Sequence, residues 1–182
     1  MGLLTPAMAK KRIYDITCAD LRRLQVDTLL LDVDNTLTTH GNPVPHERTV
    51  SWLGGMRDTG MKLVIVSNNY TDRVGKFAGL LGLEFQANCL KPLPFGLKRA
   101  MTKCGSTPEA TAMVGDQLFT DILAGKLSGC KTILVEPFEA EDSWFLSVKR
   151  AIERPILKKI QFETSGEHEQ DHLAHTDKGG HL

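Results

Sequence analysis

Two aspartates, Asp32 and Asp34, directly follow the apolar run Leu29–Leu31. Alternate residues of an extended strand share a face, and the backbone can turn where the strand ends, so both carboxylates can lie beside one cavity. In that arrangement one carboxylate can attack a substrate while the other moves protons. An isolated Asp-x-Asp at a strand end is equally typical of a turn in which the carboxylates bind the backbone, so the chemistry depends on what surrounds it.

Further polar groups follow later apolar runs. Ser67, Asn68 and Asn69 supply a hydroxyl and two amides that can hold an anion, although such residues are also common as loop caps. Lys91 precedes Pro92, so its cation would lie on a stiff turn, whereas a solvated surface lysine is the alternative. Ligands of open parallel sheets bind outside the carboxyl ends of the strands, so we expect these residues to converge with the two aspartates.

The last polar group lies in the segment Gly115–Asp121. Its glycine allows a close backbone approach, and Asp116 can reach the same cavity as Asp32. Several carboxylates at one sheet edge repel one another and require a cation. A hard divalent ion with oxygen ligands and retained waters, Mg²⁺, meets this requirement and also neutralises a phosphate. The residues therefore predict a magnesium site.

These residues need a scaffold that brings strand ends together. From Thr28 to Glu136, short apolar runs alternate with longer amphipathic runs, which is typical of βαβ units and a mostly parallel sheet. The five expected strands are Thr28–Val33, Lys62–Ser67, Leu83–Phe85, Thr111–Val114 and Lys131–Val135. The expected helices are His46–Thr59, Thr71–Leu81 with Thr71 as its cap, Phe95–Lys103 and Leu118–Ser128, with another short helical start at Thr107–Glu109. We therefore predict a Rossmann-like α/β fold with a mostly parallel five-stranded sheet flanked by helices.

Composition limits the classes of protein. The chain has 182 residues, 41% of them hydrophobic, and 22 basic residues balance 22 acidic ones. This length predicts one domain plus tails, and the balanced charge argues against nucleic acid as a partner. No apolar run approaches the length of a membrane span, and we expect no export signal. Four scattered cysteines without a zinc-binding spacing favour reduced thiols and a cytoplasmic location.

The flanks differ from the centre, and four regions are expected. Residues 1–27 form an N-terminal segment with a short helix, and residues 28–143 form the core. Residues 144–162 form a basic amphipathic helical segment, with five basic residues against one acidic residue; it can lie on an anionic membrane or pack its apolar face on the sheet. Residues 163–182 form a polar tail expected to be disordered, whose histidines could chelate a metal but are more simply solvated.

Together the polar groups resemble the four ordered motifs of the haloacid dehalogenase (HAD) superfamily of phosphatases. The phrases LLLDVDNTL, VIVSNN, VGDQLFTDILAG and TILVEP are similar to the YqeG-type, class IIIA branch, and the resemblance covers roughly Ile13 to Ile160. That branch is related to phosphatases acting on phosphatidylglycerophosphate. The resemblance implies a phosphomonoesterase with an aspartyl-phosphate intermediate.

The resemblance also implies roles for the carboxylates. Asp32 would be the nucleophile, and Asp34 would protonate the leaving oxygen and then activate water. Asp32, the backbone carbonyl of Asp34, and Asp116 would ligate Mg²⁺. Asp121 would not ligate the metal directly but would orient Lys91 or metal-bound water.

The remaining motif residues would serve the phosphate. Thr36 would steady the first motif, and the predicted phosphate-binding residues are Thr36, Ser67, Asn68 and Lys91. The negative charge of a transferring phosphoryl group is spread over its oxygens, so positioning and electrostatics are the main catalytic contributions.

The spacing of the motifs bears on the substrate. The residues between Asp34 and Ser67, and between Ser67 and Lys91, suffice only for the expected helices and strands, so no large cap domain fits. An open site suits a large substrate such as a phospholipid headgroup, with phosphatidylglycerophosphate implied by the resemblance, or requires a lid from a partner chain. The alternatives are a phosphatase of a soluble sugar phosphate or nucleotide, and a non-catalytic sensor or scaffold that binds a phosphorylated ligand. The sequence does not predict an oligomeric state.

Overall fold

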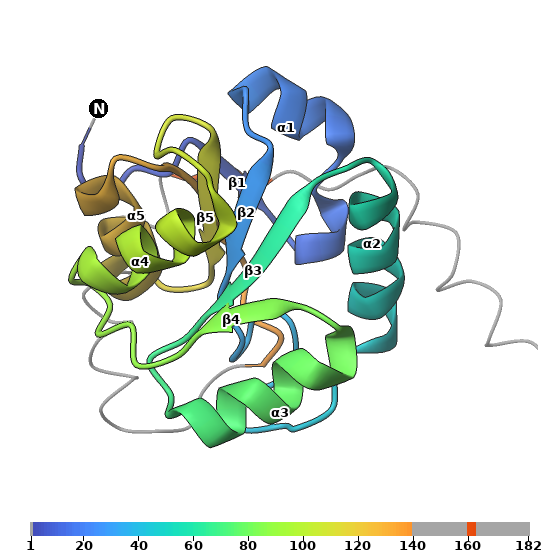
Figure 1. Ribbon diagram of the computed structural model, residues 1–182. Coiled ribbons are helices and arrows are strands. Elements are labelled where there is room, and N and C mark those ends of the chain that lie inside the picture. Colours follow the sequence, from blue (N-terminus) through green and yellow to red (C-terminus); the bar gives the residue numbers. More distant parts are fainter. Residues whose placement is uncertain (1, 140–159, 163–182) are drawn as a thin grey trace, which may run out of the picture.

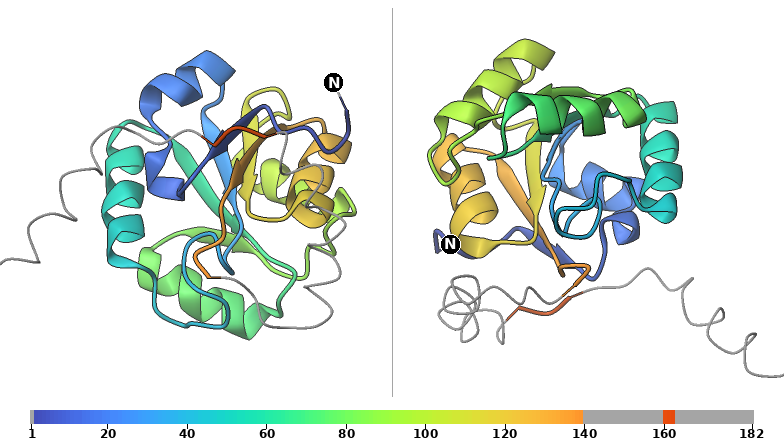
Figure 2. Two further views of the ribbon diagram at one scale, coloured as in Figure 1. Left: turned by 180° about the vertical axis from the view of Figure 1, so that it is seen from behind. Right: turned by 90° about the horizontal axis from the view of Figure 1, so that it is seen from below.

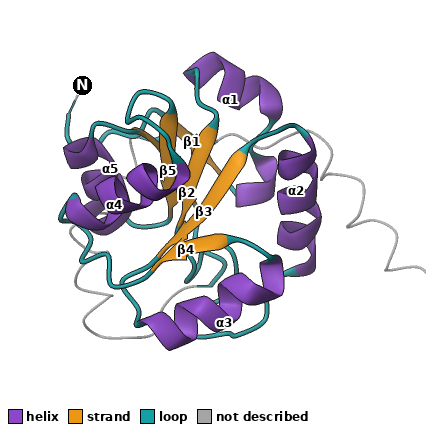
Figure 3. Ribbon diagram, viewed as in Figure 1, coloured by secondary structure: helices purple, strands orange, loops and turns teal. Residues whose placement is uncertain are grey.

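A six-stranded parallel sheet forms the centre of the computed structural model, which describes residues 2–139 and 160–162 (Figures 1 and 3). The strand order is β1-β6-β5-β2-β3-β4, and every pairing is parallel. The strands are β1 (Met8–Lys10), β2 (Thr28–Leu31), β3 (Lys62–Val66), β4 (Glu84–Gln86), β5 (Thr111–Gly115) and β6 (Lys131–Val135). The helices are η1 (Ile13–Asp15), α1 (Cys18–Leu24), α2 (Glu47–Asp58), α3 (Thr71–Leu81), α4 (Phe95–Cys104), η2 (Leu118–Ile122) and α5 (Leu123–Ser128). The predicted Rossmann-like class is confirmed.

The two faces of the sheet are both buried, because successive strand residues point to opposite sides. In β2, Leu29 and Leu31 join the core formed with α1, α2 and α3, whereas Leu30 joins the core formed with α4 and α5. In β3, Ile65 and Val66 divide in the same way. Apolar runs without polar alternation are what a sheet covered on both faces requires.

The sheet has six strands instead of the five expected, because the segment before residue 28 supplies β1. This strand pairs with β6 at the sheet edge, with Met8 beside Ile133. Its three residues carry a lysine, but Lys10 is buried and forms a 3.0 Å ion pair with Asp20 of α1. Lys10 can therefore occupy an interior position because Asp20 of α1 neutralises its charge.

Several local expectations need correction. Thr71 is the first residue of α3 and Tyr70 precedes it as the N-cap, without a side-chain hydrogen bond. Residues 107–109 form no helix, and the expected helix Leu118–Ser128 begins with the π-helical turn η2 before α5. The helix ends at Gly82 and Gly105 are confirmed, since both residues adopt the left-handed conformation that glycine favours.

Most of the expected C-terminal helical segment and all of the expected tail lie outside the described residues, because the structure does not describe residues 140–159 and 163–182. Ile160 and Phe162 pack beside β1 against Ala9, Leu118 and Leu134 (Figure 2). Among the helices of the described ranges, none is both long and apolar enough to cross a bilayer. Loops, and no cap domain, connect β2 to α2 and β4 to α4.

Candidate active site

The predicted residues meet at the carboxyl edge of the sheet. Asp32 follows β2, Ser67 follows β3 and Asp116 follows β5, while Lys91 lies in the loop after β4. In-register pairing of Leu31 with both Ile65 and Val114 places Ser67 and Asp116 one residue beyond the level of Asp32 on the neighbouring strands. The parallel register therefore assembles residues that are far apart in the sequence.

Lys91 is the centre of the charge network. Its Nζ lies 2.5 Å from Asp32 Oδ1 and 2.7 Å from Asp121 Oδ1, and it also donates to the carbonyl oxygen of Val66 at 3.3 Å. The side chain of Lys91 is 3% exposed. A buried ammonium needs such compensation, because burial of an unpaired charge is costly.

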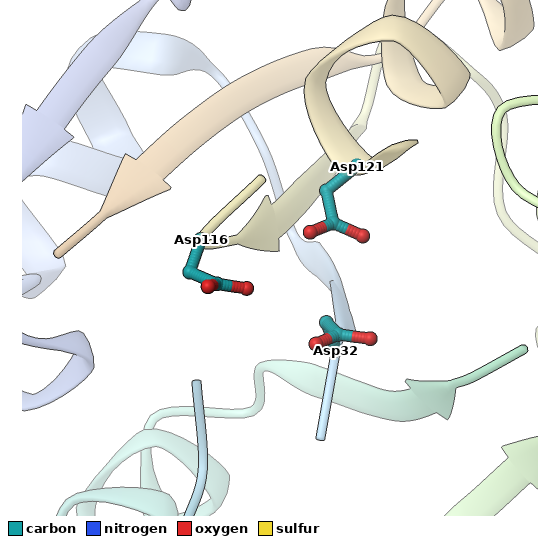
Figure 4. A group of neighbouring side chains, drawn as sticks. All are labelled: Asp32, Asp116 and Asp121. Carbon is teal, nitrogen blue, oxygen red and sulfur yellow. The ribbon is translucent and has the colours of Figure 1, made fainter. Parts of the chain in front are cut away.

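Three carboxylates converge beside this lysine. One oxygen from each of Asp32, Asp116 and Asp121 lies within 4.8 Å of the others, and all three residues are buried (Figure 4). The set offers only oxygen ligands, which are those that Mg²⁺ prefers. Three carboxylates beside one ammonium favour the binding of a further cation. The residues therefore fit a magnesium ion.

The protonation of the pair follows from burial and charge. Burial is the largest influence on Asp32; the Lys91 ammonium opposes it and the Asp121 carboxylate reinforces it, so that the pKa of Asp32 is raised to about 7. Burial alone would lower the pKa of Lys91, but Asp121 and Asp32 outweigh it and hold that pKa above its usual range. Lys91 therefore stays charged, and a second cation beside Asp32 would favour its ionised form.

Gly115 makes room for Asp121. A Cβ atom at Gly115 would lie 2.4 Å from the carboxyl carbon of Asp121, so any larger residue would displace that carboxylate. The backbone N–H of Gln117 donates to Asp121 Oδ2 at 3.1 Å and fixes its orientation. The π-helical turn η2 carries Asp121 and thus returns it towards the strand ends.

The side chain of Asp34 is held by groups on the other side of the cavity. Arg73 Nη2 donates to Asp34 Oδ1 at 2.6 Å, and Asn69 Nδ2 donates to Oδ2 at 2.8 Å. The backbone N–H of Gly41 also donates to Oδ1, at 2.9 Å. Arg73 was not among the predicted site residues; its position in the first turn of the helix that follows Ser67-Asn68-Asn69 is a signal that could have found it.

Two predicted phosphate-binding residues have other surroundings. Asn68 Nδ2 donates to the Lys91 carbonyl oxygen at 3.0 Å, and the Lys91 N–H donates to Asn68 Oδ1 at 2.7 Å, so Asn68 supports the lysine loop. The Thr36 hydroxyl is buried and has no hydrogen-bond partner among the described residues. Their contact with phosphate stays a prediction.

A cavity of about 110 Å³ opens onto this network. Its lining contains predicted residues together with neighbours that the sequence did not single out. The lining residues are Asp32, Asp34, His40, Ser67, Asn68, Asn69, Lys91, Gln117, Thr120 and Asp121. A small polar cavity beside the Asp32 carboxylate and the Lys91 ammonium can bind a phosphoryl group and stabilise its charge.

The sequence of this chain is similar to those of known proteins. A family model described as HAD-hydrolase-like matches residues 88–142. The chain is 35% identical over 151 residues to the probable phosphatase YqeG of Bacillus subtilis (strain 168), which covers 83% of this chain and 88% of that protein. It is also 35% identical over 100 residues to the pyrophosphatase PpaX of Halalkalibacterium halodurans, covering 50% of this chain and 46% of that protein.

Solved structures share the fold. The structure of NagD from Escherichia coli K-12 superposes with a TM-score of 0.55 at 15% identity, covering 78% of this chain and 95% of that chain. The cobalt-bound deoxy-D-mannose-octulosonate 8-phosphate phosphatase of Haemophilus influenzae gives a TM-score of 0.51 at 17% identity, and the match covers 74% of this chain and 89% of that chain. Because the YqeG similarity spans most of both chains, this protein belongs to the HAD-like phosphatase family, in the YqeG branch, and is an HAD-type phosphatase.

Proposed function

We propose that the protein is a Mg²⁺-dependent phosphomonoesterase that forms an aspartyl-phosphate on Asp32. The observation that carries this proposal is the position of Lys91, whose ammonium bridges Asp32 and Asp121 in the polar cavity. An ammonium at this place can neutralise the phosphoryl oxygens as they approach the attacking carboxylate. The proposed metal ligands are Asp32, the Asp34 backbone carbonyl and Asp116, with Asp121 orienting Lys91; bound Mg²⁺ would add charge neutralisation to the phosphoryl group.

The first half of the reaction transfers the phosphoryl group to the protein. An oxygen of Asp32 forms a bond to phosphorus, the ester P–O bond breaks, and Asp34 donates a proton to the departing alcohol oxygen. Lys91 and the Ser67 hydroxyl hold the phosphoryl oxygens during this step, with Asn68 and Thr36 in supporting positions. The products are the free alcohol and the aspartyl-phosphate.

The second half restores the enzyme. Asp34, now ionised, removes a proton from a water molecule whose oxygen attacks phosphorus. The bond between phosphorus and Asp32 breaks, which releases inorganic phosphate and the Asp32 carboxylate. Asp34 lines the same cavity as Asp32, which supports this assignment.

We further propose phosphatidylglycerophosphate as the substrate and phosphatidylglycerol as the product. The absence of a cap domain from the described residues supports this choice, because an open cavity admits a phosphate attached to a large lipid headgroup. A cytoplasmic enzyme with peripheral contact to an anionic membrane suits such a substrate, and co-sedimentation with anionic liposomes at low and moderate salt tests that contact.

The decisive assay measures phosphate release with Mg²⁺ from phosphatidylglycerophosphate in mixed micelles, beside soluble sugar phosphates and nucleotides. We expect preference for the lipid and no turnover by Asp32→Asn. Asp27→Asn is the matched control, because the exposed Asp27 precedes the same strand at its opposite end. Preference for a soluble ester would overturn the lipid substrate, and no release from any ester would overturn catalysis in favour of a phosphate-ligand sensor.

A further inference from the structure

A second, larger cavity adjoins the polar one. It has a volume of about 490 Å³ and lies between α3 and the loop that follows β2. We call it the α3 pocket. Its lining residues are Val33, Asn42, Pro43, Ser67, Asn69, Tyr70, Asp72, Arg73, Val74, Lys76, Phe77 and Leu80. Aliphatic and aromatic side chains along α3 form much of its wall, which suits an apolar ligand of moderate size.

The α3 pocket adjoins the polar cavity. Ser67 and Asn69 line both cavities, so the two share part of their walls. Asn69 and Arg73, which both line the α3 pocket, also hold the carboxylate of Asp34. Asp34 therefore lines the polar cavity and is bound by two residues that line the α3 pocket.

The position of Asp34 determines which part of a substrate faces the α3 pocket. The residue that protonates a leaving oxygen must lie within hydrogen-bond reach of that oxygen. With the phosphoryl group at Asp32 and Lys91, the alcohol oxygen lies beside Asp34, whose carboxylate accepts hydrogen bonds from Asn69 and Arg73 of the α3 pocket lining. An alcohol directed towards these two residues reaches the α3 pocket.

We propose that the α3 pocket binds the apolar portion of the leaving alcohol of an amphiphilic phosphomonoester. This proposal rests on the phosphatase function proposed above and adds the place where the alcohol binds. Val74, Phe77 and Leu80 supply apolar contacts along the helix, and the charged lining residues Asp72, Arg73 and Lys76 are of both signs. An alcohol with an alkyl portion matches the apolar part of this lining.

The energetic consequence can be measured with a graded series of substrates. Each methylene group transferred from water to an apolar site is expected to raise kcat/KM about fourfold. The gain ends when the chain fills the pocket. Because the alkyl chain is bound in both the ground state and the transition state, the change falls mainly on KM.

The test uses ethyl, butyl, hexyl and octyl phosphate below their micelle concentrations, with Mg²⁺ and the full chain. Leu80→Asp places a charge at the pocket wall, and Leu80 is 67% exposed, so the substitution leaves the core intact. Leu127→Asp is the matched control, because Leu127 is 45% exposed and also the penultimate residue of its helix, α5. Thermal unfolding of both variants verifies the fold.

We expect kcat/KM of the wild type to rise with chain length, Leu80→Asp to reduce that rise at least threefold over the series, and Leu127→Asp to preserve it. Hydrolysis of all four esters without dependence on chain length would overturn the α3 pocket proposal and leave the phosphatase intact. An equal effect of the two substitutions would also overturn it. Absence of hydrolysis of every ester, including phosphatidylglycerophosphate, would instead overturn the proposed function.

Discussion

Lys91 Nζ lies 2.5 Å from Oδ1 of Asp32, a residue 59 positions away in the sequence. The same ammonium lies 2.7 Å from Asp121, so one cation joins the loop after β4 to β2 and to the π-helical turn η2. The proposed catalysis and the local stability therefore depend on the same atom.

Replacement of Lys91 by methionine is expected to affect both properties. Asp32 and Asp121 would remain buried without their ammonium, at a cost of about 3 kcal/mol in the free energy of unfolding. Loss of charge stabilisation at the phosphoryl group is expected to lower kcat about 100-fold to 1,000-fold. Urea unfolding and phosphate release measure the two effects. Lys131→Met, at an exposed site at the start of β6, is the control and should change neither. A Lys91→Met variant with more than a tenth of wild-type kcat would contradict this role.

Gly115→Ala is expected to impair the site by displacing Asp121. The new methyl group would overlap that carboxylate, which must move away from Lys91. We expect a higher Mg²⁺ requirement and at least a tenfold lower kcat. The informative comparison is Gly79→Ala in α3, where a Cβ atom meets nothing within 4 Å and where alanine should stabilise the helix by about 0.5–1 kcal/mol. Wild-type Mg²⁺ dependence in Gly115→Ala would argue against the placement of Asp121.

Arg73 acts as a positioning residue for Asp34. Arg73→Ala removes the 2.6 Å ion pair, and we expect kcat to fall about tenfold to 100-fold, because Asp34 remains and only part of the roughly 100-fold to 10,000-fold contribution of general acid catalysis is lost. The loss should be larger for alkyl phosphates than for nitrophenyl phosphate, whose leaving group needs less protonation. Arg73→Lys should restore part of the activity by retaining the charge. Equal losses for both kinds of ester would indicate that Arg73 acts on the fold alone.

Asp20 links α1 to β1 in a pH-dependent way. Burial would raise the pKa of Asp20, but hydrogen bonds from Thr17 and the Lys10 ammonium outweigh it, so this pKa lies below its ordinary value. Its contribution to stability is present above the ordinary pKa and disappears as the pH falls through the lowered one.

Asp20→Asn is therefore expected to cost about 1–2 kcal/mol in the free energy of unfolding at pH 7, with a smaller difference from wild type at pH 3. Urea titrations at the two pH values measure this change. Asp58→Asn, at the exposed end of α2, is the control. A difference between wild type and Asp20→Asn that does not vary with pH would exclude the ionised carboxylate as its source.

The central strands were predictable because their burial on both faces demands continuous apolar runs. β2 and β3 show such runs, and the polar residues at their ends follow the general rule for ligand sites in parallel sheets. Lys91 was predictable for a related reason, since the strand before it ends at the same edge. These features depend on local sequence and on one rule of topology.

The features that escaped prediction depend on partners distant in the sequence. β1 is three residues long and contains Lys10, whose burial is understandable only with Asp20 beside it. Arg73 reaches Asp34 across 39 positions, and only the orientation of α3 brings them together. The α3 pocket likewise arises from the packing of a helix against a loop, for which no motif exists.

The excess of carboxylates around Lys91 has a consequence for the order of events at the site. Asp32 and Asp121 share the Lys91 ammonium, Asp116 lies within the same cluster of carboxylates, and Asp34 is paired with Arg73, so carboxylates outnumber these two cations around the cavity. A phosphate dianion would be repelled from such a cavity, whereas a divalent cation would be attracted. We therefore expect an ordered kinetic scheme in which Mg²⁺ binds first and the phosphomonoester binds second. In such a scheme free Mg²⁺ activates the enzyme, and enzyme without the metal does not retain the substrate.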